Sequence, residues 1–340
     1  IRAAATPGLS VRRAGEDVAA GDPVMAAGTR LSAAAISALA SVGLGSVLVR
    51  PQVRVAVVST GAELRDAGQA LEPGTIPDSN SLLLAGLVTE HGAVCTSVAR
   101  SGDTAESLAE VLRQAAAGAD LIITSGGVSA GAFDPLTMLA QVQRGEEAPV
   151  HLDFVKVAMQ PGKPQGHGWV LADDGRRVPI ICLPGNPVSV LVSFTTIVAP
   201  ALARLAGQDA AGGAEPLPGR AVLTARAAVG WRTPPGRRQH VPVRFTEAPT
   251  GSGVRSDVGD GAGLPWVTPT HRLGSGSHLV ASLPAAQALA VVAAEVEAVE
   301  VGDELPLIPL SASSSSATAA PAGRRQEPRT APTGRDPVSQ

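Results

Sequence analysis

The chain has few of the residues on which nucleic-acid-binding surfaces depend. Its 340 residues include no Tyr, 3 Trp and 4 Phe, and the formal net charge is -3. Proteins that bind single strands stack bases on aromatic side chains and follow the phosphates with basic grooves. The composition therefore argues against a nucleic-acid partner.

Long apolar runs and a secretory signal are also missing. No uninterrupted apolar run reaches the roughly 18 to 20 residues of a membrane span, and the N-terminus lacks the charged, apolar and small-residue succession of a signal peptide. The 2 cysteines, Cys95 and Cys182, lie in apolar strand-like runs, which favours buried reduced thiols over a disulfide or a metal site. We therefore expect a cytoplasmic protein with no membrane partner.

What is present is a regular alternation of two kinds of segment between residues 53 and 207. Short β-branched runs alternate with helical stretches, and Gly, Pro or Asp separates them. This alternation is typical of βαβ units, so we predict an α/β fold with a mostly parallel sheet and helices on both faces. Strands are expected at 53–59, 93–99, 120–124, 151–159 and 178–183, and helices near 81–91, 105–117, 135–143 and 188–206.

The rest of the chain differs in composition from this core. We assign 51–210 to the α/β domain, and 218–310 to a small antiparallel β-domain because its Val-rich runs are separated by Gly, Pro and Ser clusters. Residues 1–50 begin with Ile rather than Met and are expected to be the remnant of a larger N-terminal region. Residues 311–340 have hardly any large apolar group, so we expect a disordered tail.

Polar motifs follow the predicted strands at their carboxyl ends. Ligands of open α/β sheets bind beyond these ends, so the motifs should meet at one rim of the sheet. The most informative of them runs from Ile122 to Asp134, where Gly126 and Gly127 have no β-carbons and let an anion approach the backbone N–H groups. The rim motifs are 59–63, 102–103, 124–127, 156–164 and 184–187. The pattern predicts a cradle for a phosphate or another oxyanion.

Two of the aspartates at this rim also fit a purely structural role. Asp134 precedes Pro135, which is the usual arrangement of a helix cap and a first helical position. Asp103 precedes a predicted helix and has Glu106 three residues later, as in a capping box. The residues alone leave capping and catalysis open for both.

Glu63 and Lys156 have structural interpretations too. Glu63 follows a Ser-Thr-Gly turn and could be an ordinary solvated loop acid. Lys156 alternates with apolar neighbours, as an exposed lysine on a strand does. The turn at 184–187 is stiffened by two prolines and could be no more than a rigid connector.

Four motifs occur in a characteristic order. They are S-T-G-A-E-L at 59–64, I-T-S-G-G-V-S-A-G-x-x-D at 123–134, V-A-M-Q-P-G-K-P at 157–164 and L-P-G-N-P-V-S at 183–189. In this order they resemble the molybdopterin molybdenumtransferase family, as do R-R-A-G-E-D-V at 12–18 and G-S-G-S-H at 274–278. The resemblance extends from about residue 11 to 310.

The resemblance implies an enzyme that inserts molybdate into adenylylated molybdopterin with Mg²⁺ and releases AMP, and it implies a homodimer. Such a reaction needs anion donors, cations and carboxylates that hold Mg²⁺, and the predicted rim offers all three. The implied catalytic residues are Asp134, Glu63, Lys156 and Asp103, with Glu63 and Asp134 as metal ligands. The implied substrate-binding residues are Thr60, Gly61, Thr124, Ser125, Gly126, Gly127, Ser129, Lys163, Pro184, Gly185, Asn186, Pro187 and Ser277.

The sequence departs from the family pattern at several points. Gln160 stands where many relatives have a lysine, and Pro242 stands where an arginine is usual, with Arg237 and Arg238 nearby. Residues 1–50 also lack the family's S-A-M-D-G-Y-A type of motif. These departures favour an alternative, a non-catalytic molybdopterin-binding or scaffolding module of the gephyrin type.

A serine hydrolase is a further alternative, because residues 127–131 fit the G-x-S-x-G pattern around Ser129, with His151 or His167 as the base. A nucleophile elbow passes directly from a strand into a helix, whereas Phe133, Asp134 and Pro135 delay the helix here. No G-x-G-x-x-G or P-loop follows a strand, which argues against a dinucleotide-binding enzyme.

Overall fold

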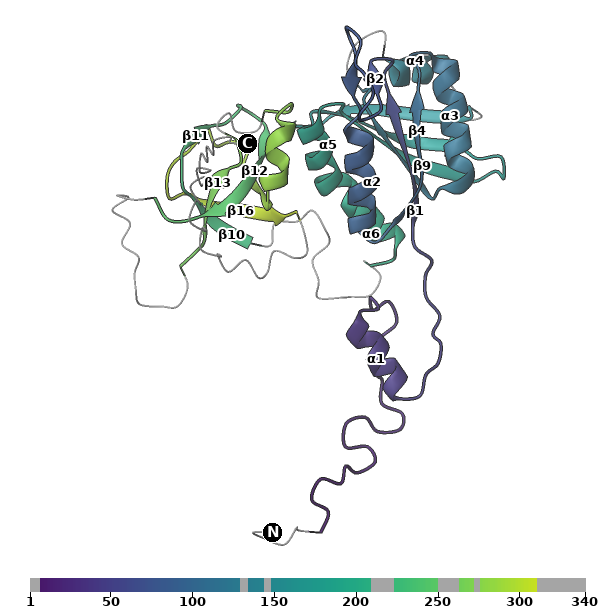
Figure 1. The fold of residues 1–340 in the computed structure, drawn as a ribbon, viewed down its shortest axis with the longest axis vertical. Helices are drawn as coiled ribbons and strands as arrows, with labels where there is room; N and C mark the ends of the chain where they lie inside the picture. Colours follow the sequence, from purple (N-terminus) through teal and green to yellow (C-terminus); the bar gives the residue numbers. More distant parts are fainter. Residues whose placement is uncertain are drawn as a thin grey trace, which may run out of the picture.

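The computed structural model describes residues 7–128, 134–143, 148–208, 223–249, 263–271 and 276–310. Two sheets build two domains, and residues 7–50 form an arm that extends away from both (Figure 1). The arm contains α1 (Ala33–Ser41), which begins where the Ser32 side chain accepts a hydrogen bond from the Ala35 N–H and which buries none of its residues. The predicted tail at 311–340 lies outside the described residues.

The first sheet carries the predicted βαβ segment. Its strand order is β4-β1-β5-β9-β8-β6, and β4, β1, β5 and β9 run parallel while β8 runs antiparallel to both of its neighbours. The bounds are β1 (Arg54–Thr60), β4 (Val94–Ser101), β5 (Leu121–Ser125), β6 (Val150–Lys156), β8 (Pro164–Leu171) and β9 (Arg177–Leu183). The predicted α/β class with a mostly parallel sheet is confirmed.

Strand β8, which contains Gly166 and Gly168, was not among the predicted strands. Packing explains both glycines. A β-carbon on Gly166 would lie 3.0 Å from the Phe154 ring and 3.0 Å from the Cys182 Cβ, and one on Gly168 would collide with the His151 carbonyl group. The glycines therefore let three strands approach closely and do not break the strand.

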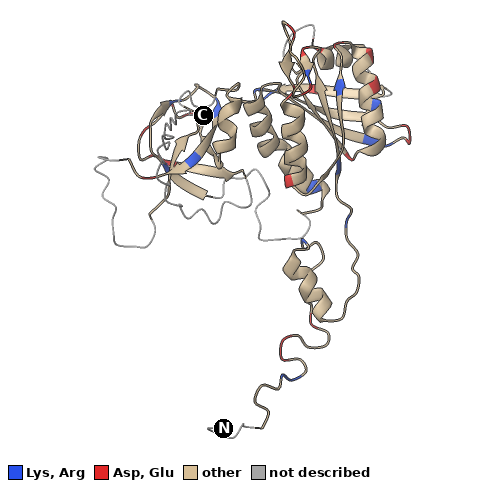
Figure 2. Ribbon diagram, in the orientation of Figure 1, with Lys and Arg blue, Asp and Glu red and all other residues tan. Residues whose placement is uncertain are grey.

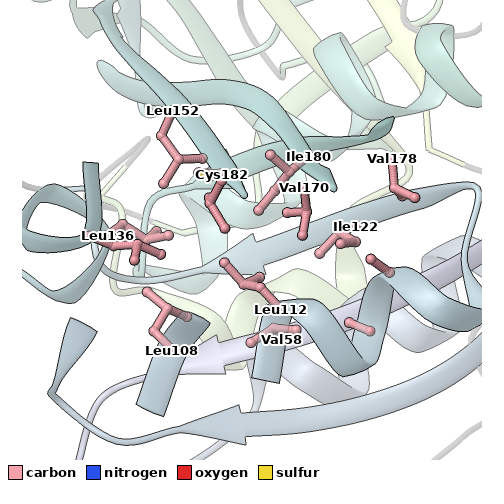
Figure 3. Close-up of a cluster of buried hydrophobic side chains, with 14 of the residues drawn as sticks. Val58, Leu108, Leu112, Ile122, Leu136, Leu152, Val170, Val178, Ile180 and Cys182 are labelled. Carbon is pink, nitrogen blue, oxygen red and sulfur yellow. The ribbon is translucent and has the colours of Figure 1, made fainter. Parts of the chain in front are cut away.

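Helices cover both faces of this sheet (Figure 1). They are α2 (Asn80–Glu90), α3 (Ala105–Gly118), α4 (Pro135–Val142), α5 (Pro187–Ser193), the π-helix η1 (Phe194–Val198) and α6 (Ala199–Leu205). Leu108, Leu112 and Leu136, from α3 and α4, pack on Ile122 and Ile180 of the sheet in one core (Figure 3). A second core on the opposite face joins α2, α5, η1 and α6 to the other side of β1 and β5.

Residues 187–205 form one continuous helical stretch in which α5, η1 and α6 follow each other. Pro200 cannot donate a backbone hydrogen bond, and the chain widens to a π-turn just before it, where the Ala199 N–H bonds to the Phe194 carbonyl. By length and mean hydropathy (1.8) the stretch could cross a membrane, although its sequence had not suggested so long an apolar segment. Since 67% of it is buried inside the domain, it has the environment of a core helix.

The second sheet forms the C-terminal domain and is largely antiparallel. Its order is β13-β10-β16-β14-β12-β7, with parallel pairs only at β10–β13 and β12–β7 among the described strands. The bounds are β7 (Met159–Gln160), β10 (Leu223–Ala227), β12 (Arg238–Thr246), β13 (Trp266–Pro269), β14 (Ala288–Val292) and β16 (Glu304–Pro309). Three smaller elements are the ribbons β2 (Leu64–Arg65) with β3 (Ile76–Pro77) and β11 (Trp231–Arg232) with β15 (Ala298–Val299), and the 3₁₀ helix η2 (Val280–Ala285).

The two domains share a joint. Strand β7 belongs to the loop between β6 and β8 but pairs with β12 of the C-terminal sheet, and the Arg238 N–H bonds to the Ala158 carbonyl at 2.9 Å. A buried apolar cluster crosses the same joint and consists of Met159, Val188, Val192, Leu289 and Ile308. The C-terminal domain is thereby held beside the N-terminus of α5.

Candidate active site

The predicted motifs lie along one edge of the first sheet. Strands β4, β1, β5 and β9 are parallel and end at this edge with Ser101, Thr60, Ser125 and Leu183. Because β8 is antiparallel to β6, the end of β6 meets the beginning of β8 at the same edge, where Lys156 pairs with Pro164. The term rim is used below for this edge and the turns that follow it.

Two consecutive glycines form the centre of the rim. Gly126 and Gly127 have φ of +86° and +73°, a left-handed backbone that other residues rarely adopt. A β-carbon on Gly126 would lie 2.9 Å from the Thr60 carbonyl oxygen, and one on Gly127 would lie 2.7 Å from Thr60 Oγ1. Gly185 lies against Gly126, since its β-carbon would be 3.4 Å from the Gly126 Cα. The turns after β1, β5 and β9 thus meet at one point, where only glycine fits at positions 126 and 127.

The backbone donors of this turn are not all available to a ligand. The Gly126 N–H donates to the Leu183 carbonyl at 3.1 Å, so it is already used within the sheet. Thr124 and Ser125 are buried in β5, and Thr60 Oγ1 donates to the Ser125 carbonyl at 3.5 Å. The prediction that residues 125–127 hold a phosphate through the backbone therefore applies best to Gly127. Ser129, also predicted to bind substrate, lies outside the described residues.

Asp134 occupies a helix-capping position, but its carboxylate does not cap the helix. Its extended backbone occupies the N-cap position of α4 and Pro135 follows as the first helical residue, but its side chain makes no capping hydrogen bond. The carboxylate is buried beside Gly127, whose β-carbon would lie 3.0 Å from Oδ1. Burial, with a smaller contribution from the Asp134 charge, raises the pKa of the Cys182 thiol to about 12. Asp134 therefore presents its carboxylate to the rim and not to the helix.

Asp103 does not cap a helix either. Helix α3 is capped by Thr104, whose hydroxyl accepts a hydrogen bond from the Ser107 N–H, so the structural alternative of an Asp103 capping box is wrong. Asp103 Oδ1 instead accepts from the Ala62 N–H at 2.8 Å and secures the turn after β1. Glu63 is exposed in that turn and folds back on Gly61 (φ +137°), where a β-carbon would collide with its carboxylate. These two acids form a pair of neighbours next to Thr60.

The two predicted lysines lie toward the other end of the rim. Lys156 ends β6 and is exposed, and β9 and β8 separate it from β5, which amounts to three strand spacings or about 14 Å. Lys163 is also exposed and follows Gly162, which packs against Ser193. A ligand that contacts both the glycine turn and these lysines has to extend along the rim.

The turn Pro184-Gly185-Asn186-Pro187 contacts the C-terminal domain. Asn186 is the N-cap residue of α5, yet its side chain donates to Ser277 Oγ at 3.1 Å instead of capping the helix. The Ser277 carbonyl accepts from the Val188 N–H at 3.1 Å and so satisfies a donor in the first turn of α5. The predicted residue Ser277 is thereby brought to the rim from a different domain.

A polar network at the start of α2 was not predicted from the sequence. Asp78 is buried and accepts hydrogen bonds from Ser59 Oγ (2.8 Å), Ser81 Oγ (2.6 Å) and the Ser81 N–H (3.1 Å). Asn80 Nδ2 donates to the Gly185 carbonyl at 2.6 Å across 105 residues. In the sequence, the segment Pro-Asp-Ser-Asn indicates no more than a helix start, because its partners are distant along the chain.

One of the departures from the family pattern has a partner in the structure. Arg237 Nη1 donates to Gln160 Oε1 at 2.7 Å, so a guanidinium group of the C-terminal domain lies beside Gln160. Pro242 is buried in β12 and pairs with Leu289 of the joint. The positive charge on this side of the rim therefore includes a residue of the second domain.

The charged residues are distributed over both domains (Figure 2). In the described part of the chain, no three His, Cys, Asp or Glu side chains gather as a metal site. Mg²⁺ commonly takes one or two protein carboxylates and completes its shell with water and substrate phosphates. Glu63 lies beside Gly61, which follows Thr60, and Asp134 lies beside Gly127, which packs on Thr60, so these two carboxylates are the candidate oxygen donors for such a partial site.

The strand order of the α/β domain and the turns at the carboxyl edge of its strands identify the class of protein to which the domain belongs. Residues 56–204 match the family model described as a probable molybdopterin binding domain. Residues 1–43 match the MoeA N-terminal region (domain I and II), and residues 224–310 match the MoeA C-terminal region (domain IV). The chain belongs to the molybdopterin molybdenumtransferase (MoeA) family.

Similar proteins agree with this assignment. Molybdopterin molybdenumtransferase 2 of Mycobacterium tuberculosis is 46% identical over 205 residues, which cover 59% of this chain and 49% of that protein. Molybdopterin molybdenumtransferase 1 of the same organism is 33% identical over 300 residues, or 88% and 64% of the two chains. The molybdopterin biosynthesis MoeA protein of Pyrococcus horikoshii has a TM-score of 0.65 at 26% identity, covering 87% and 64%. The chain thus spans about half the length of the first curated relatives it matches.

Proposed function

We propose that the rim binds adenylylated molybdopterin and that the chain takes part in the insertion of molybdate, with release of AMP. The observation that carries the proposal is the close packing of the glycine turn on Thr60, with Asp134 beside Gly127, at the carboxyl edge of the parallel strands. Ligands of α/β sheets bind at this edge, and the left-handed backbone of Gly126 and Gly127 is the kind of turn that presents N–H groups to an anion. Membership of the molybdopterin molybdenumtransferase family supports the choice of substrate.

The proposed roles follow from the positions of the side chains. The Gly127 N–H and the Lys163 ammonium group would bind the pyrophosphate, while Lys156 would attract molybdate from the exposed end of the rim. Asp134 and Glu63 would hold Mg²⁺, which would neutralise charge on the phosphates. Asp103 would act through its hydrogen bond to Ala62, which keeps Glu63 in place.

The remaining predicted substrate contacts are distributed over three turns. Thr60 and Gly61 follow β1, Thr124 and Ser125 end β5, and the turn from Pro184 to Pro187 follows β9. Ser277 would close the site from the C-terminal domain, since it already contacts Asn186. All of these residues, together with Ser129, would contact the substrate.

The proposal also includes a homodimer in the cytoplasm. The apolar side chains that the arm exposes, with Leu48 fully exposed and none of α1 buried, support a partner surface there. The cysteines Cys95 and Cys182 are free, which fits a reducing compartment. Sedimentation equilibrium tests the dimer, and a monomer at micromolar concentration would contradict it.

Turnover of variants tests the proposed function. The protein is supplied with adenylylated molybdopterin, Mg²⁺ and molybdate, and the amount of molybdenum cofactor formed is measured. Binding of molybdopterin is measured separately. Asp134→Ala and Lys156→Ala should each lower turnover by about 100-fold or more, since both would act on developing charge. Glu90→Ala, an exposed change at the far end of α2, is the matched control. Full turnover of both variants would refute the catalytic assignment, and molybdopterin binding without turnover by the wild type would favour a binding module.

A further inference from the structure

The segment from Pro77 to Ser81 is fixed in position by a buried carboxylate. Asp78 is 6% exposed, and it accepts hydrogen bonds from Ser81 at the start of α2 and from Ser59 in β1, one residue before Thr60. Arg100 of β4 lies 3.8 Å from the same carboxylate. The first turn of α2 is therefore held against the carboxyl ends of β1 and β4.

Asn80 uses this fixed position to reach the opposite turn of the rim. Its Nδ2 donates to the Gly185 carbonyl at 2.6 Å, and Gly185 lies against Gly126. A carbonyl group can only accept, so the side of the amide that faces Gly185 has to be the NH₂ group. One side chain thus connects the start of α2 to the turn after β9, and through Gly185 to the glycine turn after β5.

The other half of the Asn80 amide is unpaired among the described residues. Its Oδ1 atom is buried and accepts no hydrogen bond from the described part of the chain. Buried polar atoms are almost always hydrogen-bonded, and exceptions gather at functional sites. An amide oxygen repels phosphate and molybdate oxygens but accepts from N–H and O–H groups, so its partner has to be a donor.

We propose that Asn80 is a substrate-binding residue of the rim, which holds the Gly185 turn with Nδ2 and accepts a hydrogen bond from a donor group of the ligand with Oδ1. This inference rests on the proposed function. Two parts of adenylylated molybdopterin carry such donors: the pterin has ring N–H and amino groups, and the nucleotide has an amino group and ribose hydroxyls. Titrations with molybdopterin and with AMP, each alone, distinguish these two sources.

The variants separate the two halves of the amide. Asn80→Ala removes donor and acceptor, whereas Asn80→Asp keeps an oxygen acceptor but faces the Gly185 carbonyl with a second acceptor. Ser79→Ala is the matched control, because Ser79 is the preceding residue at the same helix start and its side chain makes no capping hydrogen bond. Thermal unfolding of all three variants shows whether a change in binding follows from a loss of fold.

Asn80→Ala should raise the Kd of molybdopterin or of AMP at least tenfold, and the affected ligand identifies the donor. Asn80→Asp should weaken the same ligand, and Ser79→Ala should change neither Kd by more than twofold, while all variants remain folded at the assay temperature. If the wild type binds and Asn80→Ala binds both ligands as tightly, the inference about Asn80 is wrong and the proposed function stands. If the wild type binds neither ligand, the proposed function fails and the role of Asn80 fails with it.

Discussion

The guanidinium group of Arg237 donates to the side-chain oxygen of Gln160 at 2.7 Å and so connects the C-terminal domain to the loop between β6 and β8. Both residues are half-buried at the joint, next to the pair of strands β7 and β12. A lysine at position 160 would place a second cation beside Arg237. The glutamine and the arginine therefore form a matched pair.

Gln160→Lys should destabilise the protein by about 1 kcal/mol or more, because it removes this hydrogen bond and brings two like charges together. The measurement is urea unfolding, with Arg237→Ala and the double variant completing a cycle. In the Arg237→Ala background the lysine should cost much less. Equal costs in both backgrounds would show that the two side chains are not coupled.

Gly127→Ala should destabilise the fold more than an ordinary glycine-to-alanine change at positive φ. Gly175 has a similar φ of +82° but open space around its would-be β-carbon, whereas that of Gly127 would lie 2.7 Å from Thr60 Oγ1. The backbone strain is common to both and amounts to about 1 kcal/mol. The additional loss of unfolding free energy in Gly127→Ala then measures the clash of the new methyl group with Thr60 and Asp134. Equal unfolding midpoints for the two variants would rule out a close-packed turn.

Stability should decrease as the pH falls from about 6.5 to about 4. Burial lowers the pKa of His240 to about 4, with a smaller contribution from Arg238. In this range the unfolded chain binds a proton at His240 and the folded chain does not, so acid favours unfolding. His240 lies directly opposite Val291, which packs against the apolar cluster of the joint. The full effect over the range is roughly 3 kcal/mol.

His240→Leu provides the control for this pH effect, because it removes the titrating group and leaves an apolar side chain opposite Val291. The difference in unfolding free energy between wild type and variant should change by most of the stated amount between pH 7 and pH 4.5. Carboxylates elsewhere titrate in both proteins and cancel in the difference. A difference that is constant with pH would mean that His240 is not buried in its neutral form.

Asp134 and Thr104 should respond to substitution in opposite ways. Thr104 caps α3 through its side chain, so Thr104→Ala should cost about 1 kcal/mol of stability and leave turnover unchanged. The Asp134 side chain does not cap α4, so Asp134→Asn should lower turnover by about 100-fold while costing less stability than the loss of the Thr104 cap. Calorimetry and the molybdenum insertion assay on both variants test this pair. A larger stability loss for Asp134→Asn would restore the structural interpretation of this residue.

The sequence was informative where the cause of the structure is local. Buried strands such as β1 and β5 are short apolar runs, and the pair Gly126-Gly127 in the sequence indicates the turn at the centre of the rim. Distant contacts were not predictable in the same way. Asp103 secures the Ala62 N–H across 41 residues, and Asn80 secures Gly185 across 105. No periodicity or spacing in a single sequence indicates such partners.

Equilibrium titration of the chain with molybdopterin shows whether the rim around Gly127 binds this ligand. We predict saturable binding of one ligand per chain, a Kd at least tenfold higher for Gly127→Ala, and an unchanged Kd for Gly175→Ala, which has similar backbone strain away from the rim. Absence of saturable binding to the wild type, or equal weakening by both substitutions, would contradict the account.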